Sequence, residues 1–128
     1  MDELMLTNSE WYVLDCLWAR APMTVMELVA ALHDRLGWAK STTITTLRRM
    51  EDKGLVRCEW EGRARRCFPA VEQKQAVIRE TRSFLDKVYQ GSVGLMVSAM
   101  AQDKALSREE IDALYAILRQ AEEGGEHV

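Results

Sequence analysis

The sequence predicts a mainly α fold with a small β-hairpin, in which a winged helix-turn-helix is followed by a C-terminal helical domain. Apolar residues recur at helical spacing in three consecutive segments up to Gly54. The period then changes to strand-like alternation on either side of Glu61-Gly62. Further helical stripes follow a polar junction at Pro69 to Gln75. We therefore expect two domains, residues 1–70 and 71–128.

Capping boxes predict where the first two helices begin. In Thr7 to Glu10 (TNSE) and Thr24 to Glu27 (TVME), a threonine hydroxyl and a glutamate carboxylate can satisfy the free amides of a helix start. The first helix should run to about Arg20, because Ala21-Pro22 cannot continue it. The second should end at Gly37, a residue that readily adopts positive φ.

The third predicted helix carries the most informative pattern, STTITTLRRMEDKGLV at residues 41–56. We expect its N-cap at Ser41 or Thr42 and its end at Lys53-Gly54. At about 100° per residue, its apolar side is formed by Thr43, Ile44, Leu47 and Met50. Its opposite side is formed by Thr42, Thr45, Arg49 and Asp52, with Thr46 and Arg48 flanking them.

This Thr/Arg side suits the major groove of DNA. Threonine can bond to phosphates and base edges and offer its methyl to thymine, and arginine is the usual bidentate partner of guanine. The pattern therefore predicts a DNA-recognition helix. A solvated helix face without a ligand remains the alternative, since threonine is only a moderate helix former.

The alternating runs after Gly54 predict a β-hairpin, the wing, with Arg63, Arg65 and Arg66 at or near its tip. We expect Arg63 and Arg65 to neutralise DNA phosphates beside the groove. Basic residues at a hairpin tip can also serve only to keep an edge strand soluble. That alternative stays open.

The distribution of charge agrees with a nucleic-acid contact in the middle of the chain. The net charge is −3, yet residues 40–66 hold eight basic and four acidic side chains, whereas residues 71–128 hold seven basic and ten acidic ones. Phosphate attraction depends on the local footprint rather than on the total. The C-terminal part is therefore not the expected contact surface.

The C-terminal helices are predicted to form a dimerisation domain. Three helices in fewer than about 60 residues bury too little surface to be stable alone. A second copy should therefore cover their apolar stripes, although packing on the winged helix of the same chain is an alternative. The candidate dimer residues are Phe84, Leu85, Val88, Met96, Met100, Ile111, Leu114 and Leu118.

No pattern in the sequence indicates an enzyme, a cofactor or a metal site. The two histidines, His33 and His127, lack partners at metal-ligand spacing. Without a signal-peptide pattern or a long apolar run, we expect a cytoplasmic protein that does not insert into membranes, with no disulfide. Cys58 and Cys67 could nevertheless face each other across the hairpin, so a thiol- or metal-responsive regulator remains an alternative.

Four segments resemble the penicillinase-repressor family (BlaI/MecI/CopY): LTNSEWYVLDCLW, STTITTLRRMEDKGLV, GRARRCFPAV and FLDKVY. The resemblance extends from about Leu6 to Gln120. It implies a homodimeric bacterial repressor, related to regulators of antibiotic resistance, that binds double-stranded operator DNA of dyad symmetry. It also implies that the groove is read by Ser41, Thr42, Thr45 and Arg49.

The resemblance also bears on how repression ends. In the β-lactam-inducible branch, a protease linked to a membrane sensor cleaves an Asn-Phe bond of the repressor, and the aligned pair here is Ala99-Met100. The cysteine-rich ending of the copper-responsive branch is missing. From another class of function, a winged helix that binds a protein instead of DNA is the competing hypothesis.

Overall fold

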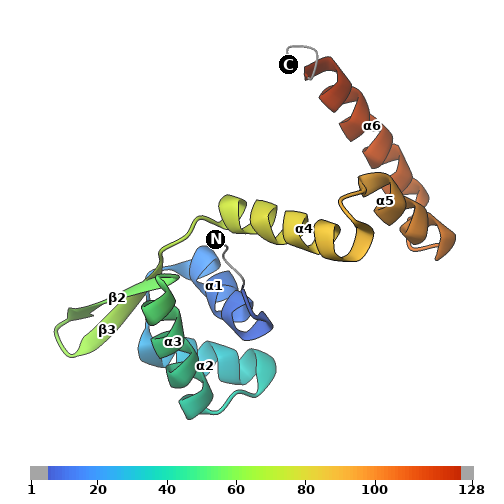
Figure 1. Ribbon diagram of the computed structural model, residues 1–128. Coiled ribbons are helices and arrows are strands. Elements are labelled where there is room, and N and C mark those ends of the chain that lie inside the picture. Colours follow the sequence, from blue (N-terminus) through green and yellow to red (C-terminus); the bar gives the residue numbers. More distant parts are fainter. Residues whose placement is uncertain (1–5, 125–128) are drawn as a thin grey trace. The chain divides into compact units, whose positions relative to one another are not determined.

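The computed structural model describes residues 6–124 and divides the chain into two compact units between Thr81 and Arg82. Figure 1 shows the elements in chain order. Their bounds are α1 Asn8–Arg20, β1 Met23–Thr24, α2 Val25–Leu36, α3 Lys40–Lys53, β2 Val56–Glu61, β3 Ala64–Pro69, α4 Gln73–Tyr89, α5 Val93–Gln102 and α6 Arg108–Gly124. The winged helix-turn-helix fold with C-terminal helices is confirmed.

The predicted helix ends are largely confirmed. Both reciprocal bonds of the first capping box form, Thr7 N to Glu10 Oε1 at 3.0 Å and Glu10 N to Thr7 Oγ1 at 3.1 Å. The box at Thr24 forms in the same way. Gly37 and Gly54 end α2 and α3 with φ of 73° and 77°, the left-handed region that favours glycine.

The expected N-cap of α3 is wrong. The helix begins at Lys40, and Ala39 is the capping residue, without a side-chain hydrogen bond. The backbone carbonyl of Ala39 accepts instead from the amides of Thr42 and Thr43, at 3.0 and 3.3 Å. Ser41 and Thr42 therefore lie inside the first turn, which leaves their hydroxyls free of a capping role.

The sheet has three antiparallel strands in the order β1-β3-β2. Its hairpin follows the prediction, with a turn at Gly62-Arg63, one residue later than expected. In the register of the hairpin, Cys58 lies opposite Cys67 and Trp60 lies opposite Arg65. Strand β1 was not predicted, because its two residues are too few for an alternating pattern to be recognised.

The core of the first unit lies between the three helices and the base of the sheet. Its largest fully buried apolar side chains are Leu14, Leu17, Leu28, Leu32, Met50 and Leu55. Truncating one such leucine costs about 2–5 kcal/mol in a well-packed core. This core fixes α3 against α1 and α2 and so determines which of its faces is exposed.

The division between the units falls within α4 and not at residue 70/71, where the polar composition of the junction predicted it. The start of α4 and the loop before it belong to the first unit. Trp18 Nε1 donates to the Val71 carbonyl at 3.0 Å, the Leu6 amide donates to Glu80 Oε2 at 3.3 Å, and Ala76 is buried. These contacts connect α1 to residues that composition alone assigned to the second domain.

The second unit leaves most of its apolar side chains exposed. No residue of α5 or α6 is fully buried. The capping box at Ser107 forms as predicted, with bonds of 3.0 and 3.1 Å to Glu110. Within residues 6–124, no helix is long and apolar enough to cross a bilayer.

Candidate nucleic-acid interface

The exposed face of α3 contains most of the predicted recognition residues. Ser41, Thr42, Thr45, Arg48 and Arg49 are exposed, whereas Thr43, Leu47 and Met50 are buried as the helical spacing predicted. The exposed face of α3 thus presents hydroxyls from its first two turns and guanidinium groups from its third turn to solvent. No side-chain hydrogen bond or ion pair within the described chain engages Arg48.

The predicted exposure of Thr46 is wrong. Its side chain is only 4% exposed, and its hydroxyl donates to the Thr42 carbonyl at 2.8 Å. At about 100° per residue, Thr46 lies beside Met50 at the edge of the apolar face, where it is buried with the core. Its hydroxyl is therefore engaged within the helix and is not available to a groove.

Arg49 is exposed but already engaged with a buried carboxylate. Its Nε donates to Glu10 Oε2 at 3.2 Å, and Lys53 Nζ approaches both oxygens of Glu10 at 2.8 and 2.9 Å. Glu10 is fully buried, whereas the Arg49 side chain is 46% exposed. The carboxylate that caps α1 therefore also fixes the C-terminal half of the recognition helix.

The electrostatics of Glu10 follow from these contacts. Burial raises the pKa of Glu10, but hydrogen bonds from Lys53, Thr7 and Arg49 lower it more, so the pKa lies below its ordinary value of 4.5. Glu10 is accordingly ionised at neutral pH. In the sequence, Glu10 is recognisable only as a capping residue, because its partners on α3 are distant along the chain.

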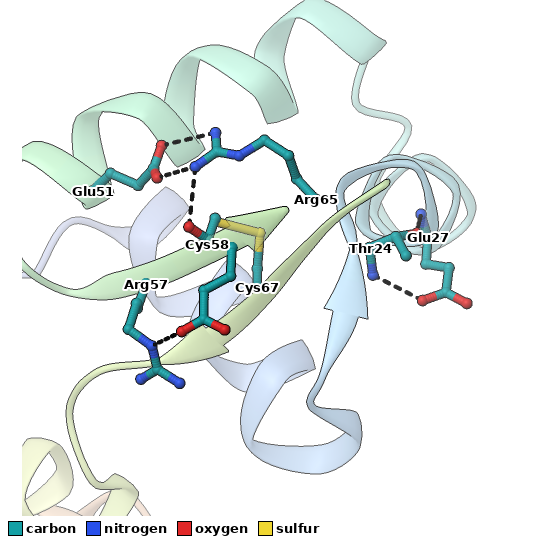
Figure 2. Close-up of a disulfide and its surroundings, with 8 residues drawn as sticks. Thr24, Glu27, Glu51, Arg57, Cys58, Arg65 and Cys67 are labelled. Carbon is teal, nitrogen blue, oxygen red and sulfur yellow. Dashed lines mark hydrogen bonds and ion pairs between the residues drawn. A yellow bond between two sulfur atoms is a disulfide. The ribbon is translucent and has the colours of Figure 1, made fainter. Parts of the chain in front are cut away.

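Arg65 connects the wing to α3 instead of lying free near the hairpin tip. Figure 2 shows its guanidinium between Glu51 of α3 and the strand that carries Cys58. Its Nη2 donates to Glu51 Oε2 at 2.6 Å and to the Cys58 carbonyl at 3.3 Å. The predicted phosphate contact of Arg65 stays a prediction, and the structure adds that Glu51 already pairs with its charge.

The other wing arginines differ in whether an acidic side chain pairs with them. Arg57 Nε donates to Glu59 at 2.9 Å, and Arg66 forms an ion pair with Glu61. Arg63 is exposed in the turn, and no ion pair within residues 6–124 engages it. Of the arginines predicted at the tip, Arg63 is the one that keeps its charge available to a phosphate.

A disulfide joins Cys58 and Cys67, contrary to the expectation of none (Figure 2). The predicted juxtaposition across the hairpin is confirmed, since the register sets the two residues opposite each other with Cα atoms 4.1 Å apart. Cys16 is free and buried. The disulfide lies beside the Arg65 bridge and links the two strands at the middle of the wing.

A shallow hollow of about 180 Å³ lies between the recognition helix and the wing. It is lined by Ile44, Leu47, Arg48 and Glu51 from α3, by Cys58 and Arg65 from the wing and by Val25 from α2. Exposed Arg48 therefore borders the wing.

In the part of the chain that the structure describes, no group of three His, Cys, Asp or Glu side chains could hold a metal ion. His127 lies outside the described residues.

Trp60 was not predicted as a site residue. It alternates with Val56 and Cys58 on one face of β2, and exposure rises along that face from buried Val56 through half-buried Cys58 to Trp60, which is 70% exposed. The guanidinium carbon of Arg65 lies 5.7 Å from the centre of the indole ring. The exposure of Trp60 could not be predicted from the alternating pattern. Alternation shows which residues share a face of the strand, but not where along the strand the core stops covering that face.

An exposed Thr/Arg helix, fixed to the core by a buried carboxylate and flanked by an arginine-tipped wing, defines the winged-helix class of transcriptional regulators. The chain belongs to the penicillinase-repressor family, since the family model "Penicillinase repressor" matches residues 6–120. The resemblance found in the sequence is confirmed. Members of this family are transcriptional repressors and not enzymes.

Known relatives match over nearly the whole chain. The chain is 28% identical to the penicillinase repressor of Bacillus licheniformis, over 90% of each chain. It is 22% identical to the methicillin resistance regulatory protein MecI of Staphylococcus aureus strain N315, over 88% of this chain and 92% of that one. A solution structure of monomeric B. licheniformis BlaI with the blaP half-operator matches with a TM-score of 0.51 and 22% identity, covering 56% of this chain and 87% of that one.

Proposed function

We propose that this protein is a homodimeric repressor that binds a dyad-symmetric operator in double-stranded DNA. The observation that carries the proposal is the exposed face of α3, where Thr42, Thr45 and Arg48 extend from a helix whose opposite face is buried. BlaI of B. licheniformis, which has the same fold, was solved on a half-operator. That relative supports DNA binding by this fold, and the exposed Thr/Arg face of α3 supports α3 as the groove-reading element.

The residues divide the task according to their contacts. Ser41, Thr42 and Thr45 read base edges, because none of their hydroxyls is needed to cap or pack the helix. Arg48 and Arg49 add positive charge to this face. Arg49 keeps the hydrogen bond from its Nε to Glu10, so it contacts DNA only through its remaining donors. Arg63 neutralises a phosphate beside the groove.

The second copy of the chain covers the apolar faces of the C-terminal helices. An apolar hollow of about 660 Å³ lies between α5 and α6, and its walls include Val97, Ile111, Leu114 and Leu118. Phe84, Val88 and Met100 are about half exposed. An exposed apolar surface of this extent is unfavourable in water unless a partner buries it. Leu85 and Met96, which are partly buried, complete the proposed dimer surface.

Repression would end when proteolysis removes the dimer domain. Linking two DNA-binding modules raises the effective concentration of the second at its half-site, so cutting the arm weakens binding without touching a DNA contact. The Ala99-Met100 bond lies inside α5. A protease that requires an extended substrate must first unwind this short helix. A protease linked to a membrane sensor is the partner that we propose for this step.

Binding to the DNA immediately upstream of the protein's own gene tests the proposal. In a gel-shift titration, Thr45→Ala and Arg48→Ala should each weaken specific binding by about 1–3 kcal/mol. Arg119→Ala is the matched control, because Arg119 is an exposed arginine of α6. The variants should unfold at the same temperature as the wild type, since neither side chain is part of the core.

Salt dependence separates DNA binding from the competing role of a protein-interaction module. Association with DNA must weaken steeply as salt rises, with a slope of about 0.9 per phosphate contacted. A mostly apolar interface with a protein would change little. A chain that failed to shift any DNA at low salt would contradict the proposed function.

A further inference from the structure

We propose that Trp60 is a further DNA contact, which packs its indole ring against deoxyribose rings of the backbone beside the groove. This inference rests on the proposed function and adds to it a contact that carries no charge. Trp60 is the most exposed of the large apolar side chains in the described part of the first unit, at 70%. An indole in water is costly unless a partner buries it.

The register of the hairpin determines the side of the wing on which Trp60 lies. Trp60 and Arg65 are opposite each other on β2 and β3, so their side chains share one face of the hairpin. Arg65 on that face reaches Glu51 of α3. The indole therefore lies on the side of the wing that is turned toward the recognition helix and its hollow.

The charges on the two faces of the wing also indicate that DNA meets the face that carries Trp60. On the opposite face, Arg57 is paired with Glu59 and Arg66 with Glu61, so that face offers no net positive charge to DNA. Arg63, whose charge is available, lies in the turn beyond Trp60. A backbone strand that meets Arg63 with a phosphate would have its neighbouring sugars within reach of the indole.

The guanidinium of Arg65 restricts the indole before any partner arrives. Its carbon lies 5.7 Å from the ring centre, and the guanidinium is itself held by Glu51 at 2.6 Å. A side chain that is already oriented loses less conformational entropy on binding. Contact with a sugar ring depends on shape and apolar area, so it should strengthen specific and non-specific binding alike.

The test compares Trp60→Ala and Trp60→Phe with the wild type on operator and unrelated duplex DNA at several salt concentrations. We expect Trp60→Ala to weaken both by about five- to tenfold with an unchanged salt slope, and Trp60→Phe to lose less. Arg63→Ala should instead lower the slope by about one. Tyr12→Ala is the control, since Tyr12 is an exposed aromatic of α1, which is outside both the proposed DNA contacts and the proposed dimer surface.

Fluorescence supplies a second measurement. Saturating DNA should change the emission of the wild type, and most of that change should be lost in Trp60→Phe. If Trp60→Ala binds DNA as tightly as the wild type, or if its loss appears only as a changed salt slope, the inference is wrong. If the wild type itself binds no DNA, the proposed function fails instead.

Discussion

Glu10 shows how one side chain can serve two elements. Its carboxylate caps α1 through the Thr7 amide and also receives Arg49 and Lys53 of α3. The local half of this arrangement is predictable, because a capping box spans only four residues. The tertiary half is not, since a carboxylate at a helix start gives no sign of which distant cations it will meet.

Glu10→Gln should lower the free energy of unfolding by about 2–3 kcal/mol at neutral pH, because the buried contacts to Arg49 and Lys53 lose their charge. Since the folded pKa of Glu10 is below its ordinary value, the carboxylate stabilises the protein above about pH 4.5 and this contribution is lost as the pH falls through the folded pKa. Urea unfolding at pH 7 and pH 3 should therefore show a difference between variant and wild type that shrinks in acid.

Glu27→Gln is the matched control for that experiment. Glu27 makes the same capping bond at 2.8 Å but is exposed and has no ion pair among the described residues. Its substitution should cost about 0.5–1 kcal/mol. Equal losses for the two glutamates would mean that the contacts of Glu10 to α3 add nothing to stability.

Thr43 and Thr46 provide a second comparison on α3. Both are buried, but Thr43 Oγ1 has no hydrogen-bond partner, whereas Thr46 Oγ1 donates to Thr42. Thr43→Val should raise the free energy of unfolding by about 1 kcal/mol, because an unsatisfied hydroxyl is removed, and Thr46→Val should lower it by a similar amount. Thermal unfolding measures both. A stabilised Thr46→Val would contradict this assignment.

At the scale of elements, periodicity predicted the helices and the hairpin, and glycine and proline predicted most of their ends. Periodicity failed where burial by other elements, or pairing with another strand, decides the structure. Thr46 is buried because the apolar face of α3 is wider than its four clearest positions, and β1 exists only because β3 is there to pair with it. The arginines of the wing were predicted, but their partners were not.

Reducing the Cys58–Cys67 disulfide should lower the free energy of unfolding of the winged helix by up to about 2–3 kcal/mol, since it closes a loop of about ten residues in the unfolded chain. Denaturant unfolding with and without a phosphine reductant measures this effect. The double variant Cys58→Ser, Cys67→Ser should not respond to the reductant. A wild type that is equally insensitive would show that the disulfide does not stabilise the unit.

At the scale of the whole molecule, the sequence predicted helices with apolar faces after residue 71 but not how they are covered. Their stripes are exposed within one chain, with Ile117 and Leu118 about 60% exposed. In our proposal, a second copy of the chain covers these stripes. The division between units was also displaced, because α4 begins against the first unit and continues without a break to Tyr89.

A chain truncated after Gln90 should fold as a winged helix, sediment as a monomer and lose most of its affinity for a full operator, while keeping its weak affinity for a half-site. The reason is the lost effective concentration of the second module. Analytical ultracentrifugation and gel shifts on full and half operators measure these properties. A truncated chain that stayed dimeric would contradict the proposal that the dimer requires α5 and α6 in addition to the α4 residues Phe84, Leu85 and Val88.

The contact of Glu10 with α3 also limits how operator preference can diverge. A change at Arg49 or Lys53 disturbs a buried carboxylate, so any new base preference gained there comes with a loss of stability. Ser41, Thr42 and Thr45 carry no such burden. Descendants of this protein that acquire new target sequences should therefore differ first in the opening turns of α3, with the end of the helix unchanged.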